Sequence, residues 1–242
     1  MEIKDSKFKY DNIIEVEDIS ATMSRRFLAG VFSWMFLALG VSAVTVYLFL
    51  NMGLINLVVG PTGYTGFGLF AIFSPLAFSL VMQFGYNRIS YPILVLLFVA
   101  YATLIGISLS VIFLIYTAAS ILGVFITASV TFGIMAIAGY TTQMDLTRFG
   151  SILYILFIGI FVASLANFFM HSEQMSYIIS YIGIAVFTGL TAYYMQMLKR
   201  IGAGIEYGDA SSKKLALIGA LALYITLINL FFMILRLFGR RR

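Results

Sequence analysis

Residues 214–242 read KLALIGALALYITLINLFFMILRLFGRRR, and this stretch decides the fold. Between Lys214 and Arg236 it holds 21 uncharged residues, which as a helix span roughly 30 Å and cross the hydrocarbon core of a bilayer. Thr226 and Asn229 lie three residues apart near its middle, so they share one face of the helix. Because an amide at this depth is costly against lipid, we expect other helices to surround this one.

The composition of the whole chain is that of a polytopic membrane protein. Of its 242 residues, 62% are hydrophobic and only 10% are charged, with a mean hydropathy of +1.02. Soluble domains carry about 25% charged residues. The first partner we expect is therefore the lipid bilayer. The net charge of +5 is typical of basic residues that set membrane orientation, so it does not indicate nucleic-acid binding.

The ligands for metal and thiol chemistry are missing from the sequence. There is no cysteine, which excludes disulfides, thiolate nucleophiles and Cys-based metal sites. A single histidine, His171, is too few for a His-built metal site. We therefore expect neither a metal nor a cofactor.

The lengths of the uncharged blocks predict seven membrane spans. Blocks of 61 and 56 uncharged residues, 27–87 and 89–144, are each long enough for two crossings. The first breaks at the Gly-rich stretch 51–66, and we place the turn in the second near residues 116–120, with Gly123 as an alternative. Blocks 149–172, 174–198 and 215–235 give one span each. The fold class is thus all-α, a seven-transmembrane helix bundle.

The basic residues predict the orientation. If seven spans are numbered from the N-terminus, eleven lysines and arginines fall on the N-terminal side and four, Arg236 and Arg240–Arg242, fall on the other. Basic residues gather on the cytoplasmic side, so we expect a cytoplasmic N-terminus. The terminal Arg-Arg-Arg conflicts with this rule. A re-entrant last helix would remove the conflict, but its full spanning length argues against that.

Residues 1–26 form the one sizeable polar segment, and residues 27–242 the membrane domain. The segment holds six of the ten acidic residues and five basic ones. It is not a signal peptide, because acids do not belong in the first region of one and no cleavage site follows. We interpret it as a solvated, partly disordered cytoplasmic tail, with a docking segment as the alternative.

The spans contain no ionisable residue at membrane depth. Pumps and coupled transporters usually keep such groups there, and an intramembrane protease needs a nucleophile with a base. We therefore predict that the protein is not an enzyme. The hydroxyls and amides at depth indicate either hydrogen bonds between helices or a polar lumen for a cation or water. They are Ser74, Ser79, Gln83, Thr103, Ser108, Asn167, Thr226 and Asn229.

Several stretches resemble the Bax inhibitor-1 family, in its bacterial branch. They are AGYTTQMDLTRFG at 138–150, GLTAYYMQMLKRI at 189–201 and ALALYITLINLFFMILRLFG at 220–239, with SPLAFSLV at 74–81 and LFVAYATLIGISLSVIFLIY at 97–116 in the right order. The resemblance implies seven helices with the last one surrounded by the other six. It also implies a calcium or proton leak, or the modulation of a membrane protein such as a quality-control protease.

The sequence departs from the family pattern at two positions. The family's calcium-leak members join their last two helices by a pair of aspartates that senses pH, one in Tyr-Asp-Thr-Gln and one in Leu-Tyr-Leu-Asp-Phe-Ile-Asn. Tyr194 and Thr226 stand at these positions, while Gln196, Asn229 and Asp145 match the pattern. Neither a phenol nor a hydroxyl titrates near neutral pH, so the switch should be absent. A Tyr194–Thr226 hydrogen bond could still join the two helices.

Two functional hypotheses follow. The first is a pH-insensitive calcium or cation leak channel, with Thr226, Asn229, Tyr194 and Asn167 as the candidate ion pathway. In it Asp145 and Gln196 are either structural or close to the ion, and a carboxylate just before a helix, as at Asp145, favours the structural role. The second is a non-conducting regulator that binds another membrane protein through the tail or the loops 139–149 and 198–214.

Overall fold

The computed structural model describes residues 3–61, 63–205 and 208–242, and for residues 3–19 only the backbone. Seven helices long and apolar enough to span a membrane lie within these ranges, which confirms the all-α class and the predicted number of spans. Their bounds are α1 Ile3–Asn51, α2 Gly66–Gly85, α3 Tyr91–Ile115, α4 Ala118–Thr141, α5 Thr147–Met170, α6 Glu173–Ala203 and α7 Ala210–Phe238. Between α1 and α2 lie a 3-10 turn, η1 Leu54–Leu57, and a small hairpin of β1 Val59–Gly60 and β2 Gly63–Tyr64.

Polar caps set several of the helix ends. The side chains of Thr65, Thr117, Ser172 and Asp209 accept hydrogen bonds from the first turns of α2, α4, α6 and α7. Proline stands in the first turn of α3, where no backbone donor is lost. The turn between α3 and α4 falls at residues 116–117, inside the predicted range 116–120 rather than at Gly123.

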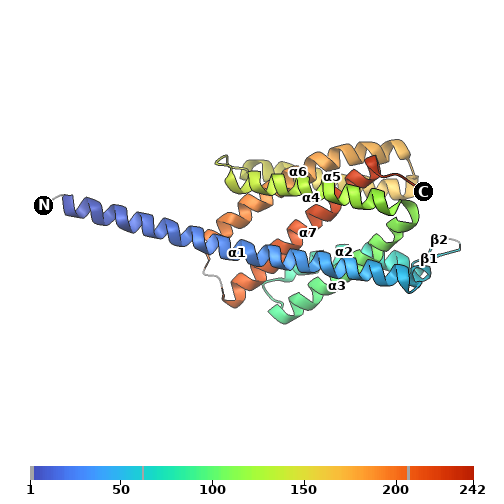
Figure 1. Ribbon diagram of the computed structural model, residues 1–242, viewed down its shortest axis with the longest axis horizontal. Helices are drawn as coiled ribbons and strands as arrows, with labels where there is room; N and C mark the ends of the chain where they lie inside the picture. The colour runs from blue at the N-terminus through green and yellow to red at the C-terminus, as the bar shows by residue number, and fades with distance from the viewer. Residues whose placement is uncertain (1–2, 62, 206–207) are drawn as a thin grey trace.

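The C-terminal helix α7 lies at the centre of the bundle. In the most apolar window of α7, 72% of the residues are buried, against 11% in α5. Figure 1 shows α7 crossing between α1–α3 and α4–α6. Helix α7 packs against α1, α3, α4 and α6 and more lightly against α2, whereas α5 packs mainly on α6. The last helix is therefore central, but α5 lies behind α6 rather than around α7.

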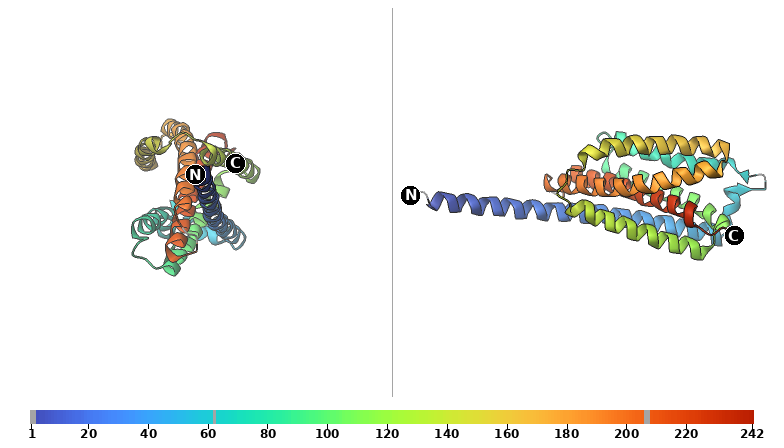
Figure 2. Two further views of the ribbon diagram at one scale, coloured as in Figure 1. Left: turned by 90° about the vertical axis from the view of Figure 1, so that its left-hand side faces the viewer. Right: turned by 90° about the horizontal axis from the view of Figure 1, so that it is seen from above.

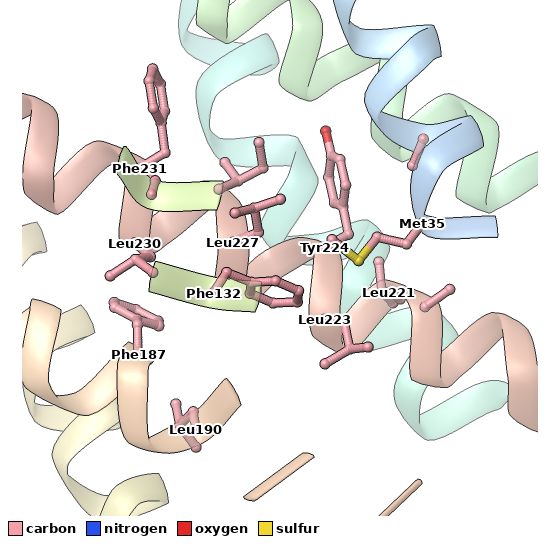
Figure 3. Close-up of a cluster of buried hydrophobic side chains, with 14 of the residues drawn as sticks. Met35, Phe132, Phe187, Leu190, Leu221, Leu223, Tyr224, Leu227, Leu230 and Phe231 are labelled. Carbon is pink, nitrogen blue, oxygen red and sulfur yellow. The ribbon is translucent and has the colours of Figure 1, made fainter. Parts of the chain in front are cut away.

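Large side chains of α7 fill the space between the two groups of helices. Figure 3 shows Leu223, Leu227 and Leu230 among side chains from α1, α4 and α6. The hydroxyls of Tyr224 and Ser42 lie 2.6 Å apart and join α7 to α1. Within a bilayer, close packing and interhelical hydrogen bonds of this kind hold helices together, because lipid is as apolar as the core.

Glycines let two pairs of helices approach closely. A Cβ atom at Gly106 of α3 would lie 2.7 Å from the backbone oxygen of Ser42 on α1. A Cβ atom at Gly139 of α4 would overlap the backbone of Ala192 on α6. Small residues at such crossings allow backbones to pack against one another in membrane bundles.

The first helix is continuous from Ile3, where the sequence suggested a partly disordered tail. Its membrane-spanning part begins at Ser20, and the preceding residues project from the bundle as a single helical arm (Figures 1 and 2). Residues 3–26 contain neither glycine nor proline, so nothing in the chain stops the helix. The expectation of disorder rested only on the high charge of this segment.

The two ends of the bundle can be named from the chain. The N side is the end at which α1 enters, and the C side is the end at which α7 leaves. On the C side, the backbone nitrogens of Thr117 and Arg242 bond the carbonyls of Arg240 and Ile115 at 3.1 and 3.0 Å. Helix α7 therefore crosses the whole bundle and is not re-entrant, and the chain ends opposite the N-terminal arm (Figure 2).

Candidate functional site

Tyr194 and Thr226 face different neighbours. The Tyr194 hydroxyl donates to the hydroxyl of Tyr154 on α5 at 2.9 Å. The Thr226 hydroxyl is buried and donates to the carbonyl of Ala222 in its own helix at 2.8 Å. The Tyr194–Thr226 hydrogen bond that the sequence allowed is therefore not formed. At these two positions α6 is tied to α5, not to α7.

Asn167 lies in a polar cavity on the C side. The cavity has a volume of about 230 Å³ and is bordered by α5, α6, the end of α7 and the α3–α4 turn. Its polar lining comes from Tyr116, Ser164, Asn167, Glu173, Ser176, Tyr177, Arg236 and Arg241. The Asn167 amide donates to the Ser176 hydroxyl at 2.7 Å and accepts from the Ser172 nitrogen at 3.1 Å. This amide thus holds the α5–α6 turn in place while it lines the cavity.

Charges of both signs surround this cavity. Arg241 pairs with Glu173 at 3.3 Å, and hydrogen bonds to Tyr116 and then to Glu173 raise the pKa of the arginine above its usual value. Arg236 is half-buried and forms no ion pair with any described residue. The described lining therefore carries two positive charges against one negative charge.

Asn229 lies beneath this cavity. It is seven residues from Arg236, two helical turns and roughly 10 Å, so the two side chains share one face of α7. The half-buried Asn229 amide donates to the carbonyl of Ile225 at 2.8 Å. An amide thus stands about half-way across the membrane, in line with a cavity that opens on the C side.

Thr188, which the sequence reading missed, lies at the same level on α6. It follows Tyr177 by eleven residues, three turns, and so shares the face of α6 that borders the cavity. The neighbours Gly183–Met233 and Leu198–Gly219 set an antiparallel register that brings Thr188 level with Asn229. The buried Thr188 hydroxyl has no hydrogen-bond partner among the described residues. The sequence shows that Thr188 and Tyr177 share one face of α6, but it does not show that this face borders a cavity.

Towards the N side the same face of α7 becomes apolar. On this face Asn229 is preceded by Ile225, Ala222 and Ile218, at intervals of four, three and four residues. Of the four residues predicted to line one pathway, Asn167 thus lines the cavity and Asn229 lies below it. Tyr194 and Thr226 point elsewhere.

On the N side, Gln196 fastens the loop between α4 and α5. Its side-chain oxygen accepts from the Leu146 nitrogen at 2.9 Å, and its nitrogen donates to the Met144 carbonyl at 2.7 Å. One side chain of α6 thereby satisfies two backbone groups of the loop. Nothing in this geometry brings Gln196 near the C-side cavity.

Asp145 lies in the same loop and is held as a carboxylate. One of its oxygens accepts from the nitrogen and hydroxyl of Thr147 at 3.1 and 2.7 Å and from the Arg200 guanidinium at 2.9 Å. The Thr147 bonds, with Arg200 after them, lower the pKa of Asp145 to about 2. The side chain is exposed and stabilises the first turn of α5.

The site combines neutral amide and hydroxyl groups with the charges of Glu173, Arg236 and Arg241 at its C-side end. No group of three or more His, Asp or Glu side chains in the described ranges could hold a metal ion. Amide and hydroxyl oxygens run from the C-side surface to about mid-membrane. The protein is thus a polytopic integral membrane protein with seven spanning helices and a central last helix. The polar cavity on its C side is the candidate solute or ion site.

Comparison with known proteins assigns the family. Residues 24–242 match the family model described as "Inhibitor of apoptosis-promoting Bax1". The inner membrane protein YbhL of Escherichia coli (strain K12) is 40% identical over 89% of this chain and 92% of its own length. A protein of Rickettsia prowazekii (strain Madrid E) is 38% identical over 90% and 91%, and a membrane protein of Streptococcus pyogenes serotype M3 is 34% identical over 89% and 93%. The chain belongs to the Bax inhibitor-1 family.

Proposed function

We propose that this protein is a cation leak channel of the bacterial inner membrane, with calcium as its principal ion, and that it is not an enzyme. The observation that carries the proposal is the C-side cavity with Asn229 and Thr188 beneath it. Hard cations such as calcium bind amide, hydroxyl and carboxylate oxygens. The side chains in and beneath the C-side cavity carry oxygens of these three kinds. The inner-membrane location is supported by the name of the relative YbhL.

The proposed pathway is polar in its C-side half and apolar in its N-side half. An ion enters past Glu173 and Asn167 and exchanges part of its water for oxygens at Asn229 and Thr188. Beyond that level Ile225, Ala222 and Ile218 present no polar group, so passage requires the N-side half to open. We therefore expect a slow leak rather than a high conductance. The unpaired charge of Arg236 slows cation entry further.

The proposed leak lacks a pH switch of the carboxylate-pair kind. Tyr194 and Thr226 replace the two aspartates that the family pattern implies, and each is bonded away from the other. Asp145 remains ionised at neutral pH because its pKa is about 2. His171 is exposed in the α5–α6 turn, and a His171→Gln variant should leak as the native protein does.

The test is calcium influx into proteoliposomes between pH 6 and pH 8. We expect a leak that is unchanged across this range and strongly reduced in Asn229→Leu. Asn87→Leu makes the same substitution at an exposed turn on the N side and should leave the leak unchanged. A protein that passes no calcium, or an Asn229→Leu variant that passes as much as Asn87→Leu, would overturn the channel proposal.

The N-terminal arm favours a second candidate, a non-conducting regulator of another membrane protein such as a quality-control protease. The arm is a continuous helix that projects beyond the bundle, and residues 1–26 hold six acidic and five basic residues. The basic residues favour a cytoplasmic location for it, as they do for the loops 139–149 and 198–214, of which 206–207 lie outside the described residues. Removing residues 1–19 separates the candidates, because a channel should still conduct and an arm-docked regulator should lose its partner.

A further inference from the structure

A second cavity opens on the C-side half of the bundle, away from the polar one. Its volume is about 500 Å³; α1, α3 and α4 line it, and the buried Ile228 and Phe231 of α7 form its floor. The lining is apolar apart from Tyr47 and Asn51, towards the end of α1, and Ser42, at the middle of the bundle. The Ser42 hydroxyl is already bonded to Tyr224 and to the Ala102 carbonyl. The α1–α4 groove is thus a hydrocarbon-lined space.

The α1–α4 groove extends across one leaflet only. Along α1 its lining runs from Leu39 to Asn51, whose positions are twelve residues apart, or roughly 18 Å of helix. Half of a hydrocarbon core is about 15 Å thick. A volume of about 500 Å³ would hold only about one turn of a helix that is roughly 10–12 Å wide with its side chains. The groove therefore fits a chain of one leaflet better than a transmembrane helix of a partner or of a second copy.

The backbone of Arg240 and Arg242 is bonded to the α3–α4 turn and the first turn of α4, at the C-side end of this groove. The Arg240 nitrogen bonds the Ser120 hydroxyl at 2.9 Å, and the Arg240 carbonyl accepts from the Thr117 nitrogen at 3.1 Å. This places Arg240 against the first turn of α4, whose Ala118, Ile121 and Leu122 line the groove. Arg241 pairs with Tyr116 as a β-bridge, so Arg240 and Arg242 point away from the face that Arg241 uses to reach Glu173.

The charges of Arg240 and Arg242 are available to a ligand. Both residues are exposed, and neither forms an ion pair within the described part of the chain. Basic residues usually gather on the cytoplasmic side of a membrane, which we expect to be the N side of this bundle. The orientation rule therefore does not explain Arg240 and Arg242 on the C side. Guanidinium groups bind phosphate oxygens in a bidentate way. An anionic headgroup at the membrane surface explains their position.

We propose that the α1–α4 groove holds an acyl chain of an anionic phospholipid from the C-side leaflet, whose phosphate binds Arg240 and Arg242. The lipid covers the apolar floor of the groove at Ile228 and Phe231 and joins α1 to α4. It thereby fills the space beside the buried Ile228 and Phe231 of the central helix. The inference does not depend on ion conduction.

The experiment measures lipid retained by the purified protein in mixed micelles that contain equal amounts of phosphatidylglycerol and phosphatidylcholine with identical acyl chains. Native mass spectrometry should show one bound phosphatidylglycerol in preference to phosphatidylcholine. Arg240→Gln/Arg242→Gln should weaken that preference roughly thirtyfold, because each of the two basic residues near a headgroup contributes about 1 kcal/mol. Arg241→Gln removes one positive charge on the opposite face and should leave the preference intact.

A second pair of variants tests the acyl chain. Ala43 lines the groove and Val44 is an exposed neighbour that does not. Ala43→Phe should expel the lipid, whereas Val44→Phe should not. Equal binding of both lipids, an equal effect of Arg241→Gln, retention of lipid by Ala43→Phe, or a dimer with no bound lipid would each overturn the proposal.

Discussion

Replacing Arg236 by glutamine should raise the calcium leak. Arg236 lines the C-side cavity and lies roughly 10 Å above Asn229 along α7. At that separation a divalent cation and a unit charge repel each other by about 0.8 kcal/mol even at the dielectric constant of water, and by more within the protein. Removal of the charge should therefore increase influx at least roughly fourfold at low ionic strength. The increase should shrink as salt is added, because salt screens exposed charges.

The assay is calcium influx into proteoliposomes loaded with a calcium-sensitive dye, at several salt concentrations. Arg236→Lys keeps the charge on a different side chain and should leave the leak near that of the native protein. This variant separates the loss of charge from a change in packing at a half-buried position. An unchanged or lower leak in Arg236→Gln, with a folded protein, would refute the reasoning that the cavity is the cation entrance.

Two further predictions concern stability. Gly139→Ala should lower the free energy of unfolding by about 1–3 kcal/mol, because its methyl group would overlap the backbone of Ala192. The loss should appear as a lower thermal midpoint in detergent. Gly133→Ala, in the same helix with open space at its Cβ position, should be neutral or stabilising; equal effects would contradict the close packing of α4 on α6. Asp145→Asn should destabilise by the same amount at pH 5 and pH 8, measured by thermal unfolding. Because its folded pKa of about 2 lies below the ordinary 3.8, the contribution is present above pH 4 and lost as the pH falls towards 2, so a difference that shrinks between pH 8 and pH 5 would contradict the assignment.

The helices of this fold could be predicted from the sequence because the membrane imposes them. An uncharged block must form whole helices of about 20 residues to satisfy its backbone, so block length alone gave the seven spans. The polarity of Asn229 indicated that the last helix is central, and α7 is the most buried of the seven. The N-terminal arm was misjudged, because charge was taken for disorder in a segment without helix breakers.

The side-chain partners could not be predicted in the same way. Each residue turns a helix by about 100°, so a family pattern that places Tyr194 and Thr226 near each other says little about where these replacements point. Tyr194 bonds Tyr154 of α5 because α5 lies behind α6, an arrangement that no span length specifies. Thr188 became significant only when the register of α6 and α7 placed it level with Asn229.

The most direct test of the proposed function is the calcium influx of Asn229→Leu compared with that of Asn87→Leu, both reconstituted at equal density and checked for folding. A pathway through the polar half of the bundle predicts that Asn229→Leu loses most of the leak while Asn87→Leu keeps it. Equal influx in the two variants would contradict a route past Asn229 and would leave the N-terminal arm as the part of the molecule that carries its function.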